Sequence, residues 1–145
     1  MTNIVFKRPD GDVAIVVLSP EAIANGVSLE DHAKELKERG DIPADYEMVA
    51  QAIELPATRE WREAWSWTTD APVIDIDHDK ATAITKDRLR KEREPLLQAQ
   101  DIAFMQAMEQ GIDTKPIVAE KQRLRDITKL ADKAETLEEL KAISV

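Results

Sequence analysis

One stretch decides the fold of the second half of the chain: residues 80–111 read KATAITKDRLRKEREPLLQAQDIAFMQAMEQG. Only Pro95 interrupts its helical pattern, and Gly111 provides a stop. A helix of this length would extend about 47 Å, more than a compact domain needs. We therefore expect a long helix over 80–110. Pro95 should kink or split it, because the proline ring lacks a backbone donor.

A second helix is predicted to return beside the first. It begins near Thr114 and Pro116, and its apolar residues recur seven apart or between those positions: Ile117, Leu124, Ile127, Ala131 and Ala134. This spacing is typical of two helices that pack at a shallow angle. We expect a helical hairpin over 80–134 with the apolar seam Leu89, Leu96, Ala103, Leu124, Ile127 and Ala131. A capping box at Thr136 then opens a terminal helix over 137–143.

The first half of the chain opens as a β-hairpin. Residues 4–7 and 13–18 are rich in β-branched side chains, and the turn-forming residues 9–12 separate them. Two short helices should follow, capped by Ser19 and Ser28 and ended by Gly26 and Gly40. Residues 46–55 alternate and predict a strand ended by Pro56.

The next elements lead to the long helix. Residues 58–67 have a helical pattern, with Trp61 and Trp65 four apart on one face. Residues 73–76 predict a short strand or an extended approach, after which Asp77 or Asp79 can cap the long helix.

The charges divide the chain into two parts. Residues 1–79 carry 7 basic and 17 acidic side chains, a net charge of −10, whereas residues 80–145 carry 13 basic and 12 acidic ones, a net charge of +1. The change of charge coincides with the change of pattern near Asp79. We predict an acidic α+β module with a small antiparallel sheet over 1–79. A long C-terminal helical hairpin with a short terminal helix follows over 80–145.

Composition limits the chemistry of the chain. It has no cysteine, which excludes disulfides, thiolate metal ligands and cysteine nucleophiles. The formal net charge of −9 disfavours a general nucleic-acid binder and a protein that docks on an anionic membrane. No apolar run reaches the ~20 residues that span a bilayer, and no signal peptide, phosphate loop or zinc-hydrolase motif is present. We predict no enzyme activity, no cofactor, and no nucleic-acid or membrane partner.

One cluster resembles a metal site, namely Asp75, Asp77, His78 and Asp79. Three carboxylates and an imidazole could ligate a divalent cation. In an extended chain, however, alternation places the carboxylates on one side and His78 on the other. We favour acidic caps at a helix N-terminus, where carboxylates meet the positive end of the helix dipole. His32 is expected to be an ordinary surface histidine.

All three tryptophans lie within residues 59–67. They could form an aromatic surface that binds a partner, because interface hot spots favour tryptophan and arginine. We favour a structural role for Trp61 and Trp65, which a core with few aromatic residues needs to join sheet and helices. Trp67 falls off their shared face and is the better candidate for a partner contact.

The basic run over 86–93 has acids interleaved and no aromatic residue. It therefore indicates a solvated helix face with ion pairs rather than a nucleic-acid site. A long, charged and weakly anchored helix gains stability by lying against another chain. We expect Arg88, Arg90 and Arg93 to meet acidic surfaces of a partner, for example the acidic half of a second copy.

A distributed set of residues carries a family resemblance. The set is Pro56, Arg62-x-x-Trp65, Asp75-x-Asp77-x-x-Lys80-Ala81, Arg88-x-x-x-x-Arg93, Leu97-x-x-x-Asp101, Ala107-x-Glu109-x-Gly111 and Lys121-Gln122-x-Leu124-Arg125-Asp126. From Tyr46 to the C-terminus the chain resembles small accessory proteins of tailed-phage and prophage tail modules, described as tail-fibre-associated or tail-assembly proteins. The resemblance implies a helical hairpin and an assembly or virion role, and it contains no catalytic signature.

These observations predict a non-enzymatic tail protein that acts through protein–protein contacts of its hairpin. Its partners would be other tail proteins, a second copy of itself, or both. It would be found in the bacterial host cytoplasm during assembly and, as a virion component, in the particle. The alternative is an inhibitor whose acidic half mimics nucleic acid and occupies a basic cleft of a host enzyme. A metal-dependent hydrolase that uses the Asp75–Asp79 cluster ranks lower still.

Overall fold

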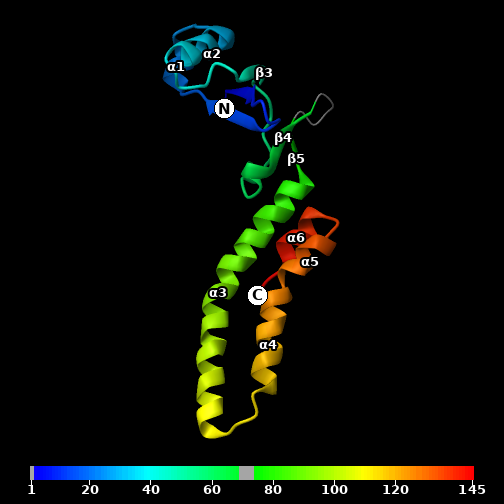
Figure 1. The fold of residues 1–145 in the computed structure, drawn as a ribbon. Helices are drawn as coiled ribbons and strands as arrows, with labels where there is room; N and C mark the ends of the chain where they lie inside the picture. The colour runs from blue at the N-terminus through cyan, green and yellow to red at the C-terminus, as the bar shows by residue number, and fades with distance from the viewer. Residues whose placement is uncertain (1, 69–73) are drawn as a thin grey trace. The chain divides into compact units, whose positions relative to one another are not determined.

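The computed structural model describes residues 2–68 and 74–145. The chain separates into two compact units, one that ends at Asp77 and one that spans His78–Val145. The first unit contains the small antiparallel sheet, and the second consists of helices, among them one long helix and its return (Figure 1). The predicted fold class, α+β with a long C-terminal helical hairpin, is confirmed.

The sheet of the first unit has three strands in the order β2-β1-β3: β1 Asn3–Lys7, β2 Val13–Val17 and β3 Glu47–Gln51. Both pairings are antiparallel, and the β1–β3 register shifts between Val5 and Phe6. The predicted β-hairpin is therefore confirmed. The strand expected over 46–55 exists but is shorter.

Successive residues of β1 face opposite sides of the sheet. Ile4 and Phe6 form one buried cluster with Ala33, and Val5 forms the other with Trp65 and Ile74. Both faces of the central strand are thus covered. Burial of a large aliphatic or aromatic side chain contributes about 1.5–3 kcal/mol, so β1 anchors this unit.

The helices α1 Pro20–Ala24 and α2 Leu29–Glu38 begin and end as predicted. The hydroxyl of Ser19 accepts a hydrogen bond from the Ala22 amide, and that of Ser28 accepts one from the Asp31 amide. Gly40 follows α2 with a positive φ of 78°, a conformation that glycine adopts at no steric cost.

The helix predicted over 58–67 is wrong. The chain forms only a short 3₁₀ turn, η1 Arg62–Ala64, and then the strand β4 Trp65–Trp67. That strand pairs antiparallel with β5 Ile74–Ile76. The sequence Trp65-Ser66-Trp67 alternates with period two, which suits a strand, whereas the spacing of Trp61 and Trp65 suits a helix. Pairing with β5 decides in favour of the strand. The predicted strand over 73–76 is confirmed for β5, and Val73 lies outside the described residues.

The second unit begins with α3 His78–Gln110, which runs unbroken through Pro95. The long helix is confirmed, and Pro95 does not split it. Its stop is also confirmed, because the Gly111 amide donates to the Met108 carbonyl and the Ile112 amide to that of Ala107. These two bonds, with a φ of 67° at Gly111, form a Schellman cap.

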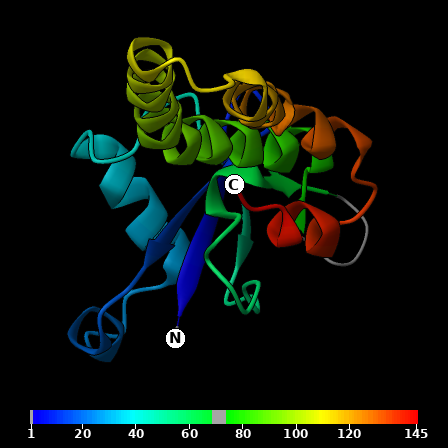
Figure 2. The same ribbon diagram turned by 90° about the horizontal axis from the view of Figure 1, so that it is seen from below.

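The chain then turns back through α4 Lys115–Asp126, α5 Thr128–Lys133 and α6 Leu137–Ala142. Figures 1 and 2 show α4 lying antiparallel beside α3, with α5 and α6 packed against the first half of α3. The predicted hairpin and terminal helix are thus present. Across the described ranges, no helix combines the length and the apolar character needed to cross a membrane.

Candidate functional site

The predicted apolar seam holds the hairpin together along only part of its length. Leu89, Leu124, Ile127 and Ala131 are at most 3% exposed. These four residues were assigned to an interface with a partner, which requires exposed side chains. They are instead covered by their own unit, so they cannot contact a partner directly. The other two members differ: Leu96 is 41% exposed, and Ala103 is only partly buried.

Two of the three arginines expected to meet a partner instead bind carbonyls of their own unit. Arg93 reaches from α3 to the end of α4, where its guanidinium donates to the carbonyls of Leu124 and Arg125 at 3.3 and 2.8 Å. Arg88 donates to the Ile143 carbonyl at 2.8 Å and to Glu92. Arg90 forms a local ion pair with Asp87. Arg88 and Arg93 therefore tie helices of their own unit together, and the partner contact expected of them stays a prediction.

Two lysines add ties between the antiparallel helices. Lys86 of α3 pairs with Asp132 of α5, near one end of the hairpin. Lys121 of α4 pairs with Asp101 of α3 at 2.5 Å, and its ammonium lies 5.5 Å from the centre of the Phe104 ring. Such partly exposed pairs contribute up to about 1 kcal/mol each. The Lys121–Asp101 pair holds the second half of α3 beside α4, where buried side chains are few.

The second half of α3 exposes large apolar side chains. Ile102, Met105 and Met108 are 53%, 58% and 63% exposed, and Ile112, just after the helix, is 57% exposed. The three helical members are three residues apart, so they lie on one side of α3. Ala107, on the side toward α4, is buried. We call Ile102, Met105, Met108 and Ile112 the distal apolar surface.

This surface was not among the residues predicted to contact a partner. Ile102, Met105 and Met108 belong to the apolar run that follows Pro95, and Ile112 comes directly after Gly111. The run is apolar on more than one side of the helix, and that is the signal that could have found the surface. A helix apolar all round needs cover on each side, and α4 covers only one.

The same side of α3 is charged earlier in the helix. Asp87 precedes Met105 by 18 residues, about five full turns at 3.6 residues per turn, so the two share a face. Asp87 is exposed and pairs with Arg90, and Lys91 beside them is exposed as well. One face of a single helix therefore changes from charged to apolar toward the hairpin tip.

The outer face of α4 carries local ion pairs. The guanidinium of Arg123 donates two hydrogen bonds to Glu120, which lowers the pKa of that carboxyl below its ordinary value. Hydrogen bonds from Gln122 and Lys129 likewise lower the pKa of Asp126. Near the tip α4 also exposes an apolar side chain, that of Val118 at 50%.

The remaining candidate residues make contacts within their own unit. Trp67 is half-buried and packs against the cluster of Val5, Trp65 and Ile74, and its expected partner contact stays a prediction. His32 is half-buried, and its Nε2 lies 3.3 Å from the Ala22 carbonyl oxygen. Asp75 lies in β5, where its carboxylate accepts from the Ile76 amide.

The other members of the Asp75–Asp79 cluster lie at the junction of the two units. The Asp77 amide donates to the Ala64 carbonyl, while His78 and Asp79 begin α3. In the ranges 2–68 and 74–145, no three acidic or histidine side chains are grouped as metal ligands.

Comparison with protein-family models, with curated proteins and with solved structures finds no match to this chain.

Proposed function

We propose that this chain is a non-enzymatic structural or assembly protein of a phage or prophage tail, and that it acts through protein–protein contacts of its helical hairpin. The distal apolar surface carries the proposal. Large apolar side chains grouped on one exposed face mark a site of interaction. Methionine side chains, of which the surface has two, adapt to different partner shapes.

The build of the hairpin supports this role. Its first half is held by buried side chains and by Arg88 and Arg93, which fixes the helix from which the tip extends. A rigid helix presents its exposed side chains at little cost in conformational entropy. The tail association itself rests on the resemblance from Tyr46 to the C-terminus, and the partner is another tail protein or a second copy of this chain.

Site-specific photo-crosslinking tests the proposal in cells that produce the tail proteins encoded with this chain. A benzophenone amino acid replaces Met105 in one variant and Asp87 in the control, since the two positions share a face of α3. We expect Met105 to crosslink to a tail protein or to a second copy, and Asp87 to give little product. Equal products from the two positions, or none from Met105, would contradict the proposal.

A second measurement separates the two roles within this class. A mass-spectrometric inventory of purified particles should contain the chain if it is a virion component. An assembly chaperone should be absent from the particles but present on tail intermediates.

A further inference from the structure

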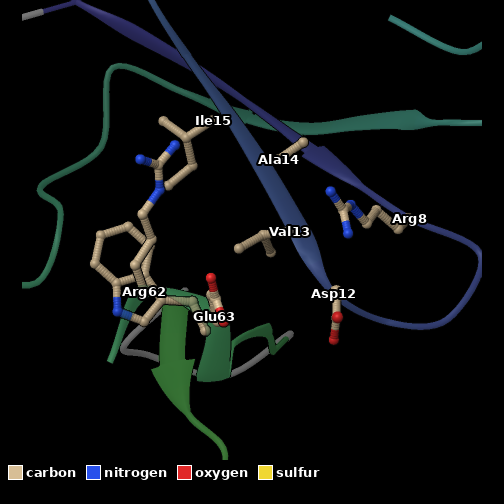
Figure 3. A pocket seen from close by; sticks show the side chains of 8 residues that line it. Arg8, Asp12, Val13, Ala14, Ile15, Arg62 and Glu63 are labelled. Carbon is tan, nitrogen blue, oxygen red and sulfur yellow. The ribbon is translucent and has the colours of Figure 1, made fainter. Parts of the chain in front are cut away.

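A hollow in the first unit lies beside the edge of the sheet. Its volume is about 530 Å³, and it is lined by four consecutive residues, 12–15, together with Arg8, Arg62, Glu63 and Trp65. Figure 3 shows residues 13–15 along β2, with Arg62 and Glu63 on the chain segment that faces the strand. A smaller hollow shares Ile15, Arg62 and Trp65 and continues to Val17, Leu55 and Arg59. Together they form a groove along the edge strand.

The outer edge of β2 carries backbone groups that point into this groove. Pairs in an antiparallel ladder alternate between bonded and non-bonded. The Leu18 amide donates to the Thr2 carbonyl and the Arg8 amide to the Asp12 carbonyl, so even-numbered residues of β2 bond to β1. The amides and carbonyls of Val13, Ile15 and Val17 therefore point to the other side.

That side is open along most of the strand. The β4 segment touches β2 through a single bridge between Asp12 and Ser66 and then diverges. In the described part of the chain, no strand pairs with the outer edge beyond this bridge. An unpaired strand edge is a template for an added strand.

The groove also holds buried donors. Trp65 is 4% exposed and lines both hollows, and its buried indole Nε1 makes no hydrogen bond within the described residues. The Nε of Arg8 is likewise buried and lacks an acceptor there. A buried donor without an acceptor costs about 1–3 kcal/mol, so a ligand that supplies acceptor oxygens is favoured.

The charge of the groove points the same way. The acidic half of the chain has seven basic side chains, and three of them, Arg8, Arg59 and Arg62, line the two hollows against the two carboxylates of Asp12 and Glu63. Arginine forms two parallel hydrogen bonds with a carboxylate. A local excess of cations in a strongly acidic unit selects an acidic ligand.

We propose that the outer edge of β2 binds an extended, acidic peptide segment of a partner protein as an added strand. Backbone hydrogen bonds to Ile15 and Val17 hold the segment, and its carboxylates meet Arg62, Arg59 and the indole of Trp65. This mode takes affinity from the main chain and specificity from alternate side chains. The site is independent of the distal apolar surface, and either one can fail without the other.

The test is a titration of the full chain with a capped hexapeptide in which valine and glutamate alternate. Binding is followed by calorimetry and by the indole N–H signal of Trp65 in NMR spectra. We expect saturable binding, a shift of that signal, and at least about tenfold weaker binding of the matching valine–lysine peptide.

Two variants separate binding from folding. Val17→Pro removes an outward amide but no bond to β1, and proline is accepted at such edge positions. It should weaken binding about threefold to tenfold, the effect of one hydrogen bond, whereas Val17→Ala, which keeps the amide, stays within about twofold. Trp65→Phe removes the buried donor and shortens a core side chain, so it should lower thermal stability, and at a temperature where circular dichroism shows it folded it should bind the glutamate peptide more weakly than wild type.

Four results would overturn the proposal. They are no saturable binding of the glutamate peptide, equal binding of the lysine peptide, unchanged binding by Val17→Pro, or the same Trp65 shift with sodium acetate at equal concentration. The last result would assign the groove to a small carboxylate instead of a peptide.

Discussion

The two halves of α3 belong to one helix but are stabilised differently. In the first half, His78–Glu94, the side chains of Ala81, Thr85 and Leu89 are buried where α5 and α6 pack. In the second half, Pro95–Gln110, only Ala107 is buried among the described side chains, although most of the apolar residues lie there. Apolar content alone therefore does not mark the core. The number of neighbouring helices decides which apolar side chains are covered.

Truncation of one side chain in each half gives the largest contrast. Leu89→Ala leaves a cavity among helices and should lower the free energy of unfolding of the helical unit by about 2–5 kcal/mol. Met105→Ala removes an exposed side chain and should change it by at most about 0.5 kcal/mol. Urea unfolding followed by circular dichroism measures both. Similar losses for the two variants would show that the second half is also packed.

The ties between helices give a smaller contrast. Arg93→Met removes two hydrogen bonds to carbonyls at the end of α4 and should cost about 1–2 kcal/mol. Arg90→Met removes only the exposed pair with Asp87 and should cost no more than about 0.5 kcal/mol. The same urea titration compares them, and an equal cost for both would contradict the role assigned to Arg93.

Two threonines that precede helices offer a matched pair. The Thr136 hydroxyl accepts from the Glu139 amide at 3.2 Å and caps α6, whereas Thr114 makes no side-chain cap bond at the start of α4. Thr136→Ala should therefore cost about 1 kcal/mol, and Thr114→Ala a few tenths at most. Thermal unfolding midpoints measure both losses of stability. A larger shift for Thr114→Ala than for Thr136→Ala would contradict the prediction.

Lowering the pH should give the smallest change in stability. Hydrogen bonds lower the pKa of Glu120 below its ordinary value near 4.5. The stability that this carboxylate contributes is present above the ordinary pKa and is lost as the pH falls through it toward the lowered one. The urea midpoint of the wild-type protein should decline as the pH falls below 5. The midpoint of Glu120→Gln should decline less over the same range. Glu109→Gln is the surface control, and its profile should match that of wild type.

Local chemistry explains what the sequence predicted well. The caps at Ser19, Ser28 and Thr136 and the stops at Gly40 and Gly111 depend on bonds within a few residues, so they can be predicted from the pattern. The β4 strand was predicted as a helix because its partner β5 comes later in the chain, and two tryptophans four apart suit a helix equally well.

The candidate site depended on contacts that the sequence does not carry. The carbonyl acceptors of Arg88 and Arg93 lie 55 and about 31 residues away, so the arginines were predicted to bind a partner. The distal apolar surface was not predicted, because spacing gives the faces of a helix but not how many neighbouring helices cover them. The groove beside β2 combines a strand edge with a 3₁₀ turn that was expected to be helix.

The central claim is that a partner binds the distal apolar surface. Methionine-methyl NMR tests it most directly, because Met105 and Met108 lie on this surface and Met48, which packs against the cluster of Ile4 and Phe6, is an internal reference. On addition of the partner that Met105 captures by crosslinking, the account predicts that the Met105 and Met108 methyl signals shift or broaden while that of Met48 stays. A complex that forms and leaves both distal signals unchanged would contradict it.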